Sequence, residues 1–347
     1  MLRNSRKSAF QEIGSIWERW KIKLATEPNF RFWLYRLKWH LAPKLKLVTH
    51  FPINLDIEIT NLCNLRCVMC PHGFDNPRTI AFHQKNLGFI NLKLVKRIID
   101  EGAKNGLSAI KFNWRGEPLL HPDLPAMVKY AKQKGIQEVM INTNGQLLTP
   151  QKSEALINAG LDKIIFSCDG ATKETYEKIR RGASFDKFNH NIKDFIAKRN
   201  SKGLKKPLVR IQMVKMDSNL TELDRFIKMW KPLVDSVTTQ DYTKRGGETQ
   251  RLSSTKKKLS RLPCPQIWQR MVITWDGKVV MCCRDWFLKN VLGEIKNETV
   301  RSFWKGKKLN QIRRLHHQKK LFKINACREC TLKETFYPVR ERDSLTG

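Results

Sequence analysis

Acidic side chains and long apolar runs are both scarce in this sequence. Its 347 residues include 32 Asp and Glu against 66 Lys and Arg, for a formal net charge of +34. No run of roughly 18 apolar residues occurs, so we expect no transmembrane helix. Glu12 and Glu18 interrupt the start of the chain before an apolar segment of signal-peptide length can form. A cytoplasmic location is therefore expected.

The shortage of acidic groups limits the kinds of partner. A chain with this excess of positive charge attracts anions, so we expect nucleic acid, an acidic membrane face or a phosphorylated substrate. Charge says nothing about the fold. The hydrophobic fraction of 41% is enough for a sizeable core and excludes a globally disordered chain.

The first 50 residues form a basic extension that is rich in aromatic residues. The pattern predicts two short helices, 9–24 and 29–41, which are separated by Glu27-Pro28 and ended by Pro43. Three interpretations are open. The extension is a helical cap that packs its aromatics on the main domain, an interfacial segment on an anionic membrane, or a platform on which nucleic-acid bases stack.

From residue 53 onward, short alternating segments are separated by helical patterns. Strands are expected at 53–59, 108–113, 137–142, 163–167, 208–214 and 234–239. Helices are expected at 92–103, 124–134, 153–159, 173–179, 188–199 and 220–229. Strands that alternate with helices indicate parallel βα units, which form an open or closed barrel.

The expected organisation has five parts. The extension over 1–50 precedes a barrel over 51–242, and the polar, basic stretch 243–262 is a linker. A small cysteine-bearing domain covers 263–336 and has too few long apolar elements to form a core without metal. The last residues, 337–347, are expected to be a frayed tail.

Eight of the nine cysteines fall in two local groups, which in a reducing compartment indicates metal rather than disulfides. Cys63, Cys67 and Cys70 form a C-x3-C-x2-C pattern directly after the first predicted strand. Three thiolates are one short of a closed zinc site and one short of a closed cubane iron–sulfur cluster. In a cubane, one iron would therefore keep an open coordination position. A zinc site completed by His72 is the alternative.

Polar residues also follow the other predicted strands. The stretches 115–118, 142–145 and 167–170 come after the second, third and fourth strands, and Gln212 and Gln240 lie near the ends of the last two. The carboxyl ends of parallel strands meet at one end of a barrel, so we expect these groups to form one site. Small residues beside the polar ones suit a closely held cofactor.

This pattern resembles the signature of the radical S-adenosylmethionine (radical SAM) enzymes, over residues 51–242. The resemblance implies a partial (β/α)6 barrel and a [4Fe–4S] cluster whose open iron binds S-adenosylmethionine (SAM). It also implies that one electron cleaves SAM to a 5′-deoxyadenosyl radical, which removes a hydrogen atom from the substrate. Met69 departs from the aromatic residue that often precedes the third cysteine in the family.

The resemblance further implies which residues hold SAM. Gly116 and Glu117 lie where the family has a Gly-Gly-Glu stretch that meets the SAM amino group, with Arg115 in place of the first glycine. The other cofactor-binding residues that it implies are Asn144, Ser167 and Asp169 for the ribose and carboxylate, and Arg180 for the carboxylate. Arg181 is the other candidate for that arginine, and Cys168 is assigned to the core.

The second cysteine group resembles an auxiliary-cluster extension of the same enzymes. The full SPASM form carries two auxiliary clusters and needs more cysteines than remain, whereas the short Twitch form carries one [4Fe–4S] cluster with four. The closing C-x2-C is a strong metal signal. The ligands that the resemblance favours are Cys264, Cys282, Cys327 and Cys330. Cys283 competes with Cys282, because neighbours on a strand point to opposite faces, and a structural zinc ribbon is the alternative.

The resemblance implies two-electron oxidation of a sugar-type, cyclitol-type or anionic substrate, with the auxiliary cluster as electron acceptor. Peptide or protein modification and epimerisation are the alternatives within the family. A zinc-stabilised nucleic-acid-binding protein is the alternative from another class. Expected partners are a small-molecule or peptide substrate, a flavodoxin- or ferredoxin-type electron donor, and an anionic membrane peripherally contacted by residues 1–50. The catalytic base is not assigned.

Overall fold

The computed structural model describes residues 10–13, 22, 24–27, 29–73, 87–243, 252–254, 263–296, 298–328 and 330. Its strands are β1 (Phe10–Ile13), β2 (Asn54–Ile57), β3 (Ala109–Phe112), β4 (Glu138–Thr143), β5 (Lys163–Ser167), β6 (Leu208–Lys215), β7 (Ser236–Asp241), β8 (Arg270–Ile273), β9 (Lys278–Val280) and β10 (Val291–Glu294). They form one sheet in the order β1-β7-β6-β5-β4-β3-β2-β8-β9-β10. The neighbours from β2 to β7 pair in parallel.

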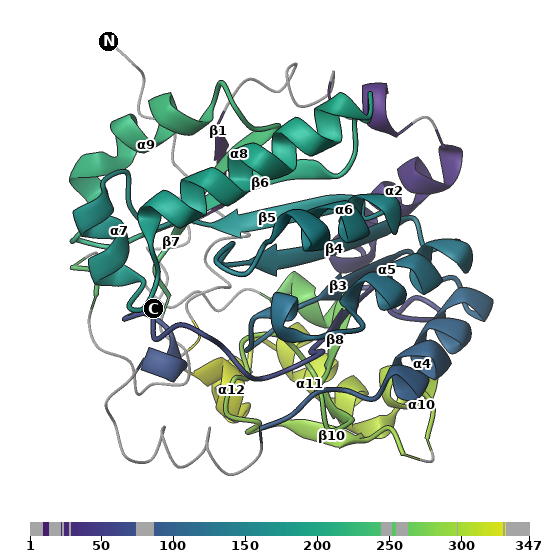
Figure 1. The fold of residues 1–347 in the computed structure, drawn as a ribbon. Helices are drawn as coiled ribbons and strands as arrows, with labels where there is room; N and C mark the ends of the chain where they lie inside the picture. Colours follow the sequence, from purple (N-terminus) through teal and green to yellow (C-terminus); the bar gives the residue numbers. More distant parts are fainter. Residues whose placement is uncertain are drawn as a thin grey trace.

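Helices pack along the outer face of this curved sheet (Figure 1). They are α2 (Phe30–Lys44), α4 (Leu92–Lys104), α5 (Leu124–Gln133), α6 (Pro150–Asn158), α7 (Lys173–Ile179), α8 (Phe185–Ser201), α9 (Leu223–Trp230), α10 (Val300–Lys305), α11 (Lys307–His317) and α12 (Asn325–Arg328). The alternation of parallel strands and helices confirms the predicted α/β fold with a partial barrel. Among the described residues, no helix combines the length and apolar character needed to cross a bilayer.

The barrel strands are apolar on their outer face and polar on their inner face. On β3, Ile110 and Phe112 are fully buried, whereas Lys111 between them lines an internal cavity. The register places Lys111 beside Asp56 of β2, which lines the same cavity. Barrel interiors are usually filled by branched apolar side chains. The polar inner face therefore leaves room for a ligand, and the hydrophobic core lies between the sheet and its helices.

The two edges of the barrel are covered in different ways. At one edge β1 pairs antiparallel with β7, so the helix predicted over 9–24 is wrong for residues 10–13, and its remainder lies largely outside the described residues. The edge of β7 presents unpaired backbone N–H and C=O groups. Residues 10–13 form a strand because they bond to these groups, although their sequence pattern is typical of a helix. At the other edge β8 pairs in parallel with β2, and β9 and β10 continue the sheet. The cysteine-bearing C-terminal segment is thus built onto the barrel.

Helix α2 closes the end of the barrel at which the strands begin. Its Phe32 and Tyr35 are buried in a cluster with Ile53 and Ala109. The Tyr35 hydroxyl donates to Glu138 Oε2 at the start of β4, at 2.9 Å. These contacts support the helical-cap interpretation of this part of the extension. The helix runs through Pro43 to Lys44 instead of ending before the proline.

We expect Tyr35→Phe to destabilise the protein by about 1–3 kcal/mol, because it leaves a buried carboxylate without one of its donors. Burial alone would raise the pKa of Glu138, but the neighbouring Lys163 and the donor hydroxyl hold it at about 2, so the group is ionised. The measurement is urea unfolding at neutral pH. Leu34→Ala, at an exposed position of the same helix, is the control and should change stability by no more than about 0.5 kcal/mol. Equal losses in the two variants would contradict this assignment.

Candidate functional site

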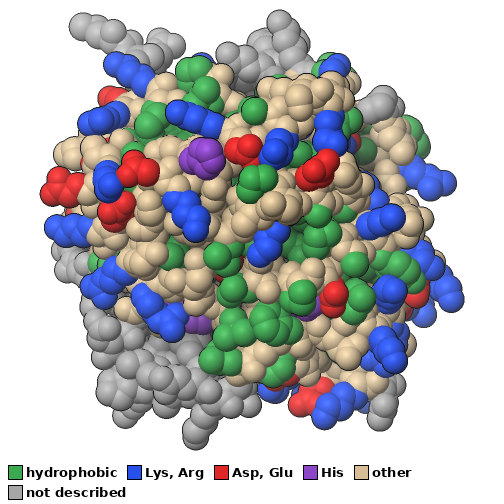
Figure 2. All heavy atoms as spheres, viewed as in Figure 1, with side chains coloured by type: hydrophobic (Ala, Val, Ile, Leu, Met, Phe, Trp, Pro, Cys, Tyr) green, Lys and Arg blue, Asp and Glu red, His purple; other side chains and the backbone are tan. Residues whose placement is uncertain are grey.

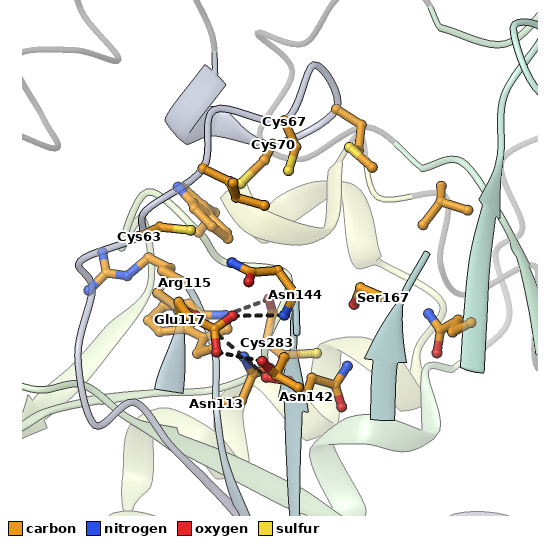
Figure 3. Close-up of a pocket in the computed structure, with 18 of the residues that line it drawn as sticks. Cys63, Cys67, Cys70, Asn113, Arg115, Glu117, Asn142, Asn144, Ser167 and Cys283 are labelled. Atoms are coloured by element: carbon orange, nitrogen blue, oxygen red, sulfur yellow. Dashed lines mark hydrogen bonds between the residues drawn. The ribbon is translucent and has the colours of Figure 1, made fainter. Parts of the chain in front are cut away.

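A cavity of about 300 Å³ lies where the barrel strands end. Figure 3 shows Cys63, Cys67 and Cys70 along one side of it and Cys283 on the opposite side, with Asn144 between them. The loop after β2 supplies the three cysteines, and the ends of β3, β4 and β5 supply further polar side chains. The predicted residues that line the cavity are Cys63, Cys67, Cys70, Gly116, Glu117, Asn144, Ser167 and Arg180.

The cysteine loop is held by backbone hydrogen bonds to the end of α7. Arg66 N donates to Arg181 O and Val68 N donates to Ile179 O, both at 3.0 Å. Burial raises the pKa of Cys67 to about 12 and also raises that of Cys63. Metal ligands must be thiolates, so the loop needs a strongly cationic centre to hold these side chains in their ligating form. A cluster of iron ions meets that need.

The loop after β3 is locked against the start of the cysteine loop. A Cβ on Gly116 would lie 2.3 Å from the carbonyl oxygen of Thr60, so only glycine allows this approach. Glu117 N donates to Leu62 O at 2.8 Å. The Glu117 carboxylate in turn accepts from Thr143 Oγ1 at 2.6 Å and from Asn144 N at 2.8 Å. Glu117 therefore ties the loops after β2, β3 and β4 together at the cavity wall.

Arg115, where the family has glycine, forms a buried bidentate ion pair. Its Nε and Nη2 donate to the two carboxylate oxygens of Glu58 at 2.6 and 2.7 Å. Its guanidinium also lies 4.5 Å from the ring centroid of Trp114. A planar guanidinium suits both contacts at once. The substitution therefore adds a link between the loop after β3 and the end of β2, and the Gly116 approach is retained.

Arg180 lies between the cysteine loop and Asp169. Its Nη1 is 3.9 Å from Cys67 Sγ, and its Nη2 is 2.6 Å from Asp169 Oδ2. The Nε of Arg180 is buried and has no hydrogen-bond partner among the described residues. Asp169 is fully buried and is not among the described residues that line the cavity. Asp169 therefore positions Arg180 in this structure, and its predicted contact with SAM stays a prediction.

Asn142, from the predicted polar stretch 142–145, lines the cavity, and its Oδ1 is buried with no hydrogen-bond partner among the described residues. Lys111, Asn113 and Arg270 also line it and are not among the predicted site residues. All four lie on the inner face of their strands or just beyond it. Strand parity could have found the last three, because residues two apart on a strand share one face.

The C-terminal segment forms the far wall of the cavity. Cys283, Arg284 and Trp286 line it, and the Trp114 indole Nε1 donates to Cys283 O at 2.8 Å. The ring of Trp286 packs edge-on against His72, with centroids 5.7 Å apart. The two segments that carry the cysteine groups therefore meet at this wall.

A second, smaller cavity of about 20 Å³ lies behind that wall. The cysteines that line it are Cys264, Cys282, Cys327 and Cys330. Burial, followed by the proximity of the other cysteines, raises the pKa of Cys282 well above its usual value. Four thiols that face one small, almost dry space fit a cluster with four protein ligands.

His316 is completely buried beside this second cavity. Its Nδ1 accepts from Cys264 N at 3.1 Å, so in the neutral ring Nε2 carries the proton. Nε2 lies 3.5 Å from Cys327 Sγ and is therefore the donor to that sulfur. No local pattern in the sequence distinguishes this histidine from its neighbour His317.

Family comparisons identify the superfamily of this chain and the cofactors that it carries. The radical SAM superfamily model matches residues 57–228, and the SPASM model, an iron–sulfur cluster-binding domain, matches residues 264–331. The two matches together take in well over half of the chain. The chain belongs to the radical SAM superfamily. Such a protein with a SPASM domain carries a SAM-binding [4Fe–4S] cluster, SAM and an auxiliary [4Fe–4S] cluster, so the zinc-stabilised alternative is set aside.

Relatives and solved structures agree with this assignment. GTP 3′,8-cyclase of Alkaliphilus metalliredigens is 32% identical over 139 residues, which cover 40% of this chain and 41% of that protein. This radical SAM chain spans about half the length of the curated relatives it matches.

Two solved structures share the fold. BtrN in complex with AdoMet and 2-DOIA has a TM-score of 0.55 at 20% identity, over 80% of this chain and 92% of that chain. Streptococcus suis SuiB bound to precursor peptide SuiA has a TM-score of 0.64 at 15% identity, over 86% and 74%. At these identities the likeness establishes the fold alone.

The residues of the first cavity fit the radical SAM cofactors. Three cysteines from one loop line the cavity together with Arg180 and Asn142. Arg180 Nε and Asn142 Oδ1 are buried and have no hydrogen-bond partner among the described residues. A carboxylate is the acceptor that the arginine lacks, and a hydroxyl or amino group is the donor that the amide lacks. SAM offers all of these groups.

Cys282 and Cys283 line different cavities, which favours Cys282 as the auxiliary ligand. We expect Cys282→Ala to lose about half of the iron of the reconstituted protein, because one of two cubane clusters lacks a ligand. Cys283→Ala is the matched control and should keep the iron content of the unmodified protein. The measurement is iron per chain after anaerobic reconstitution. Loss of iron in Cys283→Ala but not in Cys282→Ala would reverse the assignment.

Proposed function

We propose that this protein is a radical SAM dehydrogenase that oxidises an anionic sugar- or cyclitol-type substrate. The observation that carries the proposal is the wall shared by the two cavities. Cys282 lines the auxiliary cavity and its neighbour Cys283 lines the main one, so an electron from a substrate in the main cavity has a short path to the second site. The fold shared with BtrN, whose structure holds AdoMet and 2-DOIA, supports a small substrate of this kind.

The cofactors supply the radical, and residues of the chain hold the cofactors in place. When bound, the three-cysteine [4Fe–4S] cluster and SAM provide a 5′-deoxyadenosyl radical that removes a hydrogen atom. Cys63, Cys67 and Cys70 hold the cluster, and Arg180, held by Asp169, takes the SAM carboxylate. Gly116, Asn144 and Ser167 lie at strand ends where they reach the rest of SAM.

Lys111 gives the cavity its preference for an anion. Three other basic side chains near the inner face have acidic partners, in the pairs Arg270–Asp56, Arg115–Glu58 and Lys163–Glu138. The Lys111 ammonium has no hydrogen bond or ion pair within the described part of the chain, and its neighbour Asp56 is paired with Arg270. Since a partly buried ammonium without a directly bonded acceptor is costly, a phosphate or carboxylate of the substrate is its proposed partner.

The oxidation balances without an external oxidant. With the cofactors bound, a substrate carbinol C–H would lose a hydrogen atom to the radical. The O–H proton would then pass to water, and one electron would pass to the auxiliary cluster that Cys264, Cys282, Cys327 and Cys330 would hold. The product is a carbonyl group and 5′-deoxyadenosine. Trp114 and Trp286 line the main cavity at the wall between the two cavities, with their ring centroids 6.4 Å apart. A flavodoxin- or ferredoxin-type donor supplies the electron for SAM cleavage.

Epimerisation is the second candidate, and the position of Cys283 favours it. This thiol lines the main cavity rather than the auxiliary one. Its Sγ–H bond is weak enough to return a hydrogen atom to a substrate radical from the opposite side. The resulting thiyl radical takes an electron from the ferredoxin-type donor and a proton from water, so the substrate changes configuration without net oxidation.

Anaerobic protein should convert SAM to 5′-deoxyadenosine when dithionite is present, and Cys67→Ala should abolish this conversion because the open-iron cluster is lost. Cys327→Ala should keep SAM cleavage, since only the auxiliary site is changed. The measurement is chromatography of 5′-deoxyadenosine. Absence of 5′-deoxyadenosine from the fully loaded protein would contradict the proposal.

A reaction with substrate in D₂O distinguishes the two candidate reactions. A product two mass units lighter than the substrate indicates dehydrogenation, and a product one mass unit heavier than the substrate indicates epimerisation.

Lys111→Met should weaken the binding of sugar phosphates at least tenfold, about 1.4 kcal/mol, while SAM binding stays unchanged. Burial lowers the pKa of Lys111. The ammonium is therefore present below that lowered pKa, and affinity should fall as the pH rises through it, at a lower pH than for an exposed lysine. The measurement is tryptophan fluorescence titration with glucose 1-phosphate. Unchanged affinity in Lys111→Met would reject this residue as the anion site.

A further inference from the structure

Helix α2 carries a row of exposed apolar side chains along its outer face. These residues are Phe30, Leu34, Leu37, Leu41 and, directly after the helix, Leu45. Spacings of three and four residues place them on one side of a helix. Phe30 is 75% exposed and Leu37 is 53% exposed, values that are unusual for side chains of this size in a continuous row. We call this row the α2 stripe.

The opposite face of the helix is already in use. Phe32, Tyr35 and Ala42 are buried against the start of the barrel strands. Gln269 Nε2 also donates to Trp39 O at 2.8 Å, which ties the middle of the helix to the segment before β8. The helix is therefore held firmly by one face, and the stripe points away from the protein.

The charges around the stripe have one sign. Residues 30–47 contain no Asp or Glu. Their basic side chains are Arg31, Arg36, Lys38, Lys44 and Lys46. In Figure 2, Lys and Arg side chains also outnumber Asp and Glu over the drawn face of the molecule. A partner for this surface must accept leucine side chains and offer negative charge close to them.

We propose that the α2 stripe seats the protein on the surface of an anionic bilayer. The leucines and Phe30 enter the boundary between headgroups and acyl chains, and the flanking lysines and arginines meet lipid phosphates. Nucleic acid offers phosphates but no apolar layer for a row of leucines. An apolar surface that also bears phosphates is the property of a lipid leaflet, and charge complementarity selects anionic lipids.

This seating has a consequence for the substrate. The helix lies at the end of the barrel where the strands begin, whereas the cysteine-lined cavity lies where they end. A protein seated on α2 therefore turns the cavity away from the bilayer. A water-soluble anionic substrate can reach it there, which agrees with the role proposed for Lys111, although the membrane proposal does not depend on that role.

The test is co-sedimentation of the full chain with sucrose-loaded vesicles at low and high salt. We expect binding to vesicles of phosphatidylcholine and phosphatidylglycerol in equal amounts, little binding to phosphatidylcholine alone, and weaker binding at high salt. The variant Leu37→Glu/Leu41→Glu should lower the bound fraction at least tenfold, about 1.4 kcal/mol. Both residues are exposed, so its thermal unfolding midpoint should match that of the unmodified protein.

The matched control is Leu87→Glu/Leu220→Glu. It makes the same change in charge at two leucines that are 45% and 43% exposed and that follow the ends of β2 and β6, away from α2, and it should bind vesicles like the unmodified protein. Failure of the unmodified protein to bind the mixed vesicles at low salt would overturn the proposal, as would equal losses in the two variants. A dimer that Leu37→Glu/Leu41→Glu converts to a monomer, without vesicle binding, would assign the stripe to a second copy of the chain instead.

Discussion

The alternation of apolar and polar residues along the barrel strands is the constraint on which the rest of the structure depends. The outward residues, such as Ile110 and Phe112, form the core beneath the helices and must stabilise the fold alone. The inward ion pairs, Arg270–Asp56 among them, add little net stability, because their mutual attraction is offset by the loss of water. Their value lies in keeping an open, polar interior that a packed barrel would not have.

The open interior requires its walls to be fixed by backbone rather than by packing. The Gly116 approach to the carbonyl oxygen of Thr60 and the hydrogen bonds of the cysteine loop to the end of α7 supply this rigidity. Glu117 completes it, since one buried carboxylate accepts from side-chain and backbone donors of the neighbouring strand end. Backbone contacts and one buried carboxylate thus fix the walls of the site, and fixed walls lower the entropic cost of binding.

Local patterns were sufficient to predict the barrel and the residues at its strand ends, because strand parity and motif spacing are short-range properties. They were not sufficient for residues whose environment is set by distant segments. The strand at 10–13 forms because β7 has a free edge, and the task of Asp169 follows from the position of Arg180. His316 acquires its place beside Cys264 and Cys327 only through packing of α11 on the C-terminal segment. These partners are 11 or more residues apart in the sequence, beyond the reach of local periodicity.

Continuation of the sheet from β2 through β8 to β9 explains why two cavities can share one wall. Because β8 pairs in register with β2 and β9 runs antiparallel to β8, the chain that leaves β9 turns back along the barrel wall, on the side of the main cavity opposite the cysteine loop (Figure 3). The two cysteines that follow β9 line different cavities. Cys282 meets the auxiliary cavity and Cys283 the main one, with the Trp114 indole bonded to the Cys283 carbonyl between them. An auxiliary site on a separately packed domain would have no fixed distance from the substrate. Here the auxiliary site is joined to the edge of the barrel sheet, and strand pairing fixes its distance from the main cavity.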